Sequence, residues 1–291
     1  MGESLHFVDS NAHVAAPVEA RSRYPLRPLP GTEHEWTESQ AVTPEELVAC
    51  MDDAGIHQAY LMSQMFHGFD CSYCADAVSR FPDRFVGVAN VDIFGPDAIA
   101  QVDHWILSRG MHGLRFWPGG RGVATWVDDP RYFPVWERVR ELGVPSNAHT
   151  TRPPALPATR RFLDRFGGIP FTINALGHVP YLEGPDTADA GNLLALAAYP
   201  RVYVNFSIEF LEATGQSPAA RGFLNALVES FGARRLLWSN FYPGLRKRPF
   251  REAKDILLRA LSAFSPDDRK WIAGEAAREL YPALGRASSH S

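Results

Sequence analysis

Short apolar, β-branched and aromatic segments alternate along the chain with longer segments of helical periodicity, and this alternation constrains the fold more than any other feature. The candidate strands are residues 5–10, 58–63, 85–92, 113–117, 144–149, 171–176, 202–207 and 235–240. Helical patterns cover 45–55, 97–110, 133–143, 156–167 and 218–232, and several end in glycine, as a left-handed C-cap requires. The alternation predicts parallel βαβ units.

Eight strands in β-then-α order favour an α/β protein built as a closed (β/α)8 TIM barrel. The length of 291 residues suits a single domain of this kind. We therefore predict one domain over 1–291, with a loop insertion at 15–44 and a basic, proline-broken mouth loop at 241–252. In such barrels the active site lies at the C-terminal ends of the strands.

Composition limits the partners of the chain. The net charge of -4 shows no basic excess, so we predict no nucleic-acid partner. No apolar run approaches the roughly 20 residues that cross a bilayer, and no leader pattern opens the chain, so we predict no membrane partner and a cytoplasmic location. Cys71 and Cys74 form a CxxC without a second pair, and we interpret them as small buried residues.

Polar side chains, mainly Asn and His, gather where the predicted strands end. They are Asp9, Asn11 and His13 after the first strand, Arg115 on the fourth, Asn147 and His149 on the fifth, Asn174 and His178 at the sixth, and Asn240 and Tyr242 at the eighth. Carboxylates are scarce in this set. Because parallel strands of a barrel end at one mouth, we predict that these residues line one site.

Seven segments in order resemble a known family: FVDSNAHV, FPDRFVGVANVD, GLRFWP, GVPSNAHT, INALGHVP, RLLWSNFYP and IAGEAARELY. The chain is similar to the amidohydrolase-related (amidohydrolase 2) group of the amidohydrolase superfamily, and within it to the lactonase-like branch that includes 2-pyrone-4,6-dicarboxylate lactonase. The resemblance runs from about residue 5 to residue 283 and implies a distorted (β/α)8 barrel. Metal-bound members place ligands in an Asp-x-His-x-His motif after strand one, on strands five and six, and at an Asp on strand eight.

Carried over to this chain, the metal-ligand pattern is eroded. Asn11 stands where the family has the first His of strand one, whereas His13 keeps the second. His149 matches the strand-five ligand, and the best ungapped match puts Ala175 at the strand-six ligand. An amide oxygen is a poor substitute for imidazole on zinc, and alanine cannot ligate.

The strand-eight carboxylate is also missing. The ungapped match puts Phe241 at the Asp position, and a shift by one residue puts Asn240 there. The resemblance therefore implies an enzyme of this family that has lost its metal dependence and uses no cofactor. The alternative is one zinc ion held by His13, His149 and His178, with an open fourth position.

Without a metal, hydrolysis needs a general base and donors for the developing oxyanion. His13 and His149 are candidates for base and acid, because imidazole titrates near neutrality. Asp9 is a candidate for orienting His13 or a water molecule; the alternative is a structural carboxylate bonded to Asn neighbours.

Substrate binding is assigned to the remaining polar residues of the mouth: Asn11, Arg115, Asn147, Asn174, His178, Asn240 and Tyr242. The amides can bind a carbonyl oxygen or a carboxylate without charge. Arg115 can clamp a carboxylate with two hydrogen bonds, or it forms a strand-end salt bridge. Arg246, Lys247 and Arg248 can draw in an anion, or they are a solvated surface run.

We therefore predict a metal-independent hydrolase of a lactone, ester or related acyl bond, acting on a small, anionic, carboxylate-bearing cyclic or aromatic substrate. One alternative is a decarboxylase or isomerase on the same scaffold. Another is a non-catalytic barrel that binds a small molecule, since fold does not guarantee function. Barrels of this group often pair, so a homo-oligomer is compatible with the resemblance.

Overall fold

The computed structural model describes residues 5–28, 41–117, 126–148, 152–242 and 249–286. Eight parallel strands form a nearly closed barrel: β1 (Val8–Ala12), β2 (Gln58–Met62), β3 (Phe85–Asp92), β4 (Gly113–Trp117), β5 (Ser146–Ala148), β6 (Phe171–Ile173), β7 (Val202–Ser207) and β8 (Leu236–Ser239). Neighbouring strands pair in sequence order from β1 to β8. The predicted (β/α)8 TIM barrel is confirmed.

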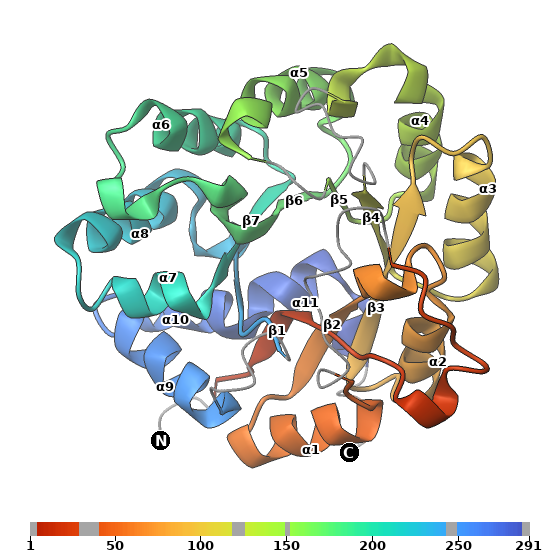
Figure 1. Ribbon diagram of the computed structural model, residues 1–291. Helices are drawn as coiled ribbons and strands as arrows, with labels where there is room; N and C mark the ends of the chain where they lie inside the picture. The colour runs from red at the N-terminus through yellow and green to blue at the C-terminus, as the bar shows by residue number, and fades with distance from the viewer. Residues whose placement is uncertain (1–4, 29–40, 118–125, 149–151, 243–248, 287–291) are drawn as a thin grey trace.

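Helices surround the strands (Figure 1). They are α1 (Pro44–Ala54), α2 (Ser72–Arg80), α3 (Ala98–Asp103), α4 (Phe133–Leu142), α5 (Leu156–Phe166), α6 (Ala188–Leu194), α7 (Ile208–Ala213), α8 (Pro218–Phe231), α9 (Phe250–Ala260), α10 (Pro266–Lys270), α11 (Ala276–Leu280) and α12 (Ala283–Arg286). Shorter turns include η8 (Asn174–His178) and η9 (Tyr181–Glu183). Within the described part of the chain, no helix has both the length and the apolar character of a membrane span.

Hydrogen bonds link β1 to the last two strands, β7 and β8, and so help to close the barrel. The hydroxyl of Ser10 donates to the Trp238 carbonyl of β8 at 2.7 Å, and Asn205 Nδ2 of β7 donates to that hydroxyl at 2.5 Å. The Asn240 amide, just after β8, donates to Asp9 Oδ1 at 3.2 Å. These bonds fix β1 relative to β8 at the end of the barrel where the strands finish.

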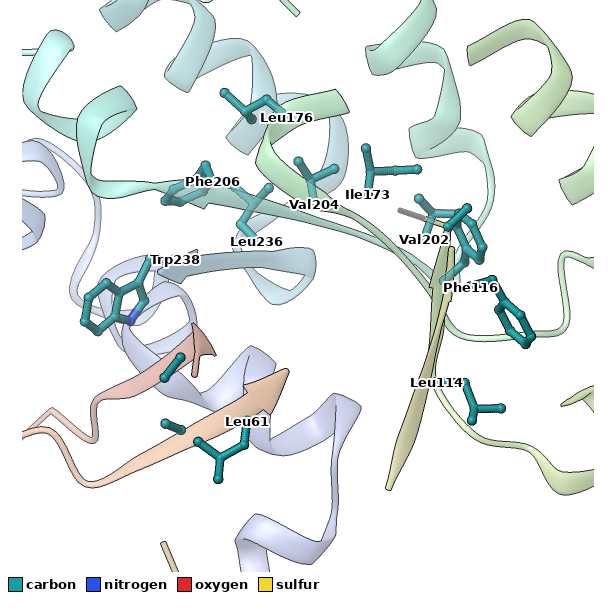
Figure 2. Packing of buried hydrophobic residues seen from close by; sticks show 14 of the residues in the cluster. Leu61, Leu114, Phe116, Ile173, Leu176, Val202, Val204, Phe206, Leu236 and Trp238 are labelled. Atoms are coloured by element: carbon teal, nitrogen blue, oxygen red, sulfur yellow. The ribbon is translucent and has the colours of Figure 1, made fainter. Parts of the chain in front are cut away.

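Alternate residues of the strands divide between two hydrophobic clusters. One set, which includes Phe116, Phe206 and Trp238, packs in the large cluster shared with the surrounding helices (Figure 2). The residues between them pack instead with α11 and α12; this second set is Val8, Tyr60, Met62, Val86, Val88, Tyr203 and Leu237. Since strand residues alternate between two faces, the second set points into the barrel, and the C-terminal helices close its N-terminal end.

The predicted helix ends agree with the structure at two glycines. Gly55 and Gly143 follow α1 and α4 with φ of 66° each, in the left-handed C-cap conformation. The prediction that the sixth strand reaches residue 176 is wrong. β6 ends at Ile173, because positive φ angles begin at Ala175 and no strand accommodates them.

The predicted loop boundaries also need correction. The mouth loop does not extend to residue 252, because α9 begins at Phe250, and residues 243–248 lie outside the described residues. The insertion at 15–44 ends one residue earlier, since Pro44 begins α1 behind a Thr43 capping box. An antiparallel bridge between Ala15 and Val42 joins the two ends of this insertion.

Candidate active site

Asp9 provides a buried carboxyl group at the end of β1. Its Oδ1 accepts hydrogen bonds from the backbone amides of Asn11 (3.0 Å) and Asn240 (3.2 Å). Its Oδ2 has no hydrogen-bond partner among the described residues. Burial raises the pKa of Asp9 to about 7, although the two amide bonds act in the opposite direction. A carboxyl group with a pKa near neutrality can both accept and release a proton.

His13 is held at the mouth in a neutral form. Its Nδ1 lies 2.9 Å from the Met62 carbonyl oxygen, so Nδ1 carries the proton in this arrangement. The His13 amide donates to the Tyr242 carbonyl at 2.9 Å, and its ring meets the Phe241 ring edge-on at 5.2 Å between centroids. Burial, and then the charge of Arg115, lower the pKa of His13 to about 3. The imidazole is therefore a weak base at neutral pH.

Arg115 brings a permanent cation to the same region. Its Nε donates to Asn90 Oδ1 at 2.9 Å, and its Nη2 donates to the Ser63 carbonyl at 2.7 Å. Asn90 is fixed in turn by Nδ2 bonds to Ser63 and Gly68. The Asn90 and Ser63 oxygens are neutral, so these two hydrogen bonds orient the guanidinium without adding a countercharge.

The strand register sets further amides beside this cation. Asn90, Arg115 and Asn147 are direct partners across β3, β4 and β5. Asn205 on β7 uses both ends of its amide, since Oδ1 accepts from the Ala175 amide at 3.4 Å and Nδ2 donates to Ser10. These contacts form two hydrogen-bonded groups, one around Arg115 and one around Asn205; together with the other amides at the strand ends we call them the polar layer.

Several amide atoms of this layer are buried without a hydrogen-bond partner among the described residues. They are Oδ1 of Asn11, Asn147 and Asn174, and both polar side-chain atoms of Asn240. Buried polar groups in native proteins are nearly always hydrogen-bonded to protein, water or ligand. Because these atoms come from the ends of β1, β5, β6 and β8, they can together bind a polar ligand at the mouth.

Tyr242 and His178 also make contacts outside this layer, and their role in substrate binding stays a prediction. Tyr242 contributes its backbone carbonyl to His13, but its hydroxyl lies 3.5 Å from Cys50 Sγ of α1 and its ring packs on Phe250 of α9. His178 lies on η8 and lines a pocket between η8 and α7; burial and the charge of Arg152 lower its pKa.

Some predicted residues are not tested by this geometry. His149, expected as a catalytic acid or base, and the basic run 246–248 lie outside the described residues. Cys71 and Cys74 are buried free thiols, as predicted, and burial raises their pKa values to about 11 and about 12. Such thiols are poor nucleophiles and metal ligands at neutral pH.

The described donor set does not fit a catalytic metal ion. Among the residues that the structure describes, no three His, Cys, Asp or Glu side chains form a group that could hold one. Asn11 offers a neutral amide and Ala175 offers no donor at the positions where the family has imidazoles. The combination of His13, His149 and His178 includes a residue outside the described chain and stays a prediction.

The strand pattern places Asn205 at the end of the seventh predicted strand, but neither Asn205 nor Ser10 received a predicted role, although both hold the polar layer together. The left-handed turn that follows β6 had no sequence signal, since Gly177 is the one glycine among its four positive-φ residues.

A (β/α)8 barrel with a buried carboxyl group and a cation at its strand ends has the arrangement of the barrel enzymes, whose active sites lie at this end. The amidohydrolase family model matches residues 8–283, and the chain belongs to this family. The resemblance seen in the sequence is confirmed.

Three relatives illustrate the similarity. The L-fucono-1,5-lactonase of Burkholderia ambifaria is 25% identical over 202 residues, which are 69% of each protein. A probable 2-pyrone-4,6-dicarboxylic acid hydrolase of Acinetobacter baumannii, with citric acid bound, superposes with a TM-score of 0.76 at 17% identity, covering 96% of this chain and 100% of that one. A dihydroxybenzoic acid decarboxylase of Polaromonas sp. JS666, with bound manganese and an inhibitor, gives 0.67 at 17% identity, covering 96% and 97%.

Proposed function

We propose that this protein hydrolyses a lactone, ester or related acyl bond in a small cyclic or aromatic compound that carries a carboxylate, without a metal ion. The observation that supports this proposal most directly is the hydrogen bonding of the Asp9 carboxyl group. Two backbone amides hold its Oδ1, whereas its Oδ2 has no partner among the described residues. The similarity to a lactonase and to the fold of a pyrone dicarboxylic acid hydrolase supports the reaction class.

Asp9 acts as the general base in this proposal. Its ionised form takes a proton from a water molecule through Oδ2, and the oxygen of that water attacks the acyl carbon. When the tetrahedral intermediate breaks its bond to the leaving oxygen, the proton on Oδ2 passes to that oxygen. The pKa of about 7 makes both transfers accessible near neutrality.

His13 has a different role from the one expected from its residue type. With a pKa lowered to about 3 it does not take up a proton at neutral pH, so it positions water or substrate through hydrogen bonds. Asn240, whose buried Nδ2 has no partner among the described residues, supplies a donor for the developing oxyanion. The Oδ1 atoms of Asn11, Asn147 and Asn174 accept hydrogen bonds from water or from substrate hydroxyl groups.

Arg115 selects an anionic substrate. Its charge lies in a buried, weakly polarisable environment, where it attracts a carboxylate more strongly than it would in water. The Asn90 and Ser63 contacts keep the guanidinium in one orientation.

A second candidate reaction is decarboxylation. A carboxyl group that keeps its proton up to about pH 7 can also deliver that proton to the carbanion left when carbon dioxide departs. The similar fold of the dihydroxybenzoic acid decarboxylase makes this the alternative to test.

Turnover in water enriched in ¹⁸O separates the candidates. A panel of carboxylate-bearing lactones, esters and hydroxybenzoates would be incubated with the protein, with Asp9→Asn, and with Asp186→Asn, an exposed matched control. One heavy oxygen in the acid product supports hydrolysis, whereas carbon dioxide release with none in the organic product supports decarboxylation. Turnover of nothing on the panel would favour the non-catalytic binding alternative.

A further inference from the structure

A pocket of 510 Å³ lies beside the polar layer, between η8, η9 and the start of α7. We propose that it binds an uncharged apolar ring of the substrate, carrying at most a hydroxyl group. This inference rests on the proposed function, because it assigns the part of the substrate that lies away from the reacting bond.

The wall of the pocket is built by an unusual backbone. Four consecutive residues have a left-handed backbone conformation, with φ angles of 47° at Ala175, 56° at Leu176, 61° at Gly177 and 54° at His178. This conformation costs a non-glycine residue about 1–2 kcal/mol. Buried packing of Leu176 and the bond from the Ala175 amide to Asn205 hold the turn in place. Strain maintained in this way is concentrated at functional sites.

The left-handed turn also links the pocket to β1, the strand that carries Asp9. Ala175, which lines the pocket, donates to Asn205 Oδ1, and Asn205 Nδ2 donates to the hydroxyl of Ser10. Ser10 is the neighbour of Asp9 on β1. A ring in the pocket would thus lie next to the polar layer that holds the acyl group.

The chemistry of the lining favours a neutral ring. Val179, Leu182 and Phe210 supply apolar surface, and the volume is in the range of small-molecule sites. Among the lining residues described, Glu183 is acidic and none is Lys or Arg, although the charge of Arg152 acts on His178 at the pocket wall. The lining itself therefore offers a carboxylate no cation, whereas Arg115 offers one in the polar layer, so the two ends of the substrate are distinguished by charge.

Binding of two simple probes tests the pocket without any turnover. Phenol and benzoate would be titrated at pH 7.5 into the full chain with Arg115→Met, so that benzoate is not held by Arg115, and followed by ligand-observed NMR. We expect phenol to bind at least roughly tenfold more tightly than benzoate, and Glu183→Gln to narrow this ratio. Ser207→Leu, which fills the pocket from its β7 side, should weaken phenol binding at least roughly tenfold. Ser230→Leu, on the exposed face of α8, is the matched control and should change nothing.

Equal affinity for both probes, or phenol binding unaffected by Ser207→Leu, would overturn the inference. If Ser207→Leu does not fold, Leu182→Asp at the exposed rim of the pocket serves instead. It replaces apolar lining by a charge without disturbing the core, and it should likewise weaken phenol binding. Phenol binding should be unchanged in Asp9→Asn, since Asp9 does not line the pocket. Failure of the hydrolysis assay with intact phenol binding would therefore reject the proposed reaction and keep the pocket, and the reverse result would reject the pocket alone.

Discussion

His13 and Arg115 are held by neighbouring carbonyl groups at the end of β2. Nδ1 of His13 lies 2.9 Å from the Met62 oxygen, and Nη2 of Arg115 donates to the Ser63 oxygen at 2.7 Å. These two adjacent residues thus fix a neutral imidazole close to a permanent cation, and the cation helps to keep the imidazole neutral. Of the two side chains, Arg115 therefore carries the positive charge.

Replacing Arg115 by Met should reduce kcat/KM for a carboxylate-bearing substrate by about 10²-fold, since a buried charged hydrogen-bonding pair contributes a few kcal/mol. Arg115→Lys should recover part of the lost kcat/KM, because lysine keeps the positive charge but lacks the two parallel N–H donors of a guanidinium group. The methyl ester of the same substrate provides the comparison. If the acid and its methyl ester lose activity equally, Arg115 does not recognise the carboxylate.

Asp9→Asn should stabilise the protein more as the pH rises. The unfolded carboxyl group ionises near pH 4, whereas the folded one keeps its proton until about pH 7, so wild-type stability falls between these values. We expect the unfolding free energy of the variant, relative to wild type, to increase by roughly 2–4 kcal/mol between pH 4 and pH 8. Urea unfolding at both pH values measures this difference, and any pH-independent effect of the amide cancels.

A relative stability that stays constant from pH 4 to pH 8 would mean that folding does not raise the pKa of Asp9, which would then ionise near pH 4 in both states. The proton-transfer role given to Asp9 would then lose its electrostatic basis.

The unpartnered side-chain amide of Asn240 should stabilise the transition state. Asn240→Ala keeps the backbone N–H that holds Asp9 but removes the unpartnered Nδ2 donor, and should lower kcat by about 10–10³-fold while KM changes little. Asn192→Ala, on the exposed face of α6, is the matched control. A large rise in KM with unchanged kcat would show instead that Asn240 binds the ground state.

Ala175→Gly should relieve the left-handed turn. The φ of 47° is unfavourable for alanine and ordinary for glycine, so the variant should be more stable by about 0.5–1 kcal/mol in chemical unfolding. The same substitution at Ala226, in the middle of α8, is the control and should destabilise the protein, because glycine is a poor helix former. Equal effects at both sites would argue against strain at η8.

The sequence patterns located the strands and the polar residues at their ends, because strand periodicity and the barrel rule need only local information. They could not assign the base. His13 was expected to titrate near neutrality, as an exposed imidazole does, and Asp9 was expected to orient it. Their order of basicity is reversed by burial, which raises the pKa of Asp9 and lowers that of His13, and by the charge of Arg115 on another strand, which lowers the pKa of His13 further. Such long-range desolvation leaves no local sequence signal.

The most direct test of the proposed mechanism is the pH dependence of kcat/KM for the hydrolysed substrate after exhaustive chelation. Wild-type protein should keep its activity, with a rising limb centred near pH 7, and Asp9→Asn should lose at least about 10²-fold. Activity that disappears on chelation and returns with zinc or manganese, or a rising limb that persists in Asp9→Asn, would contradict it.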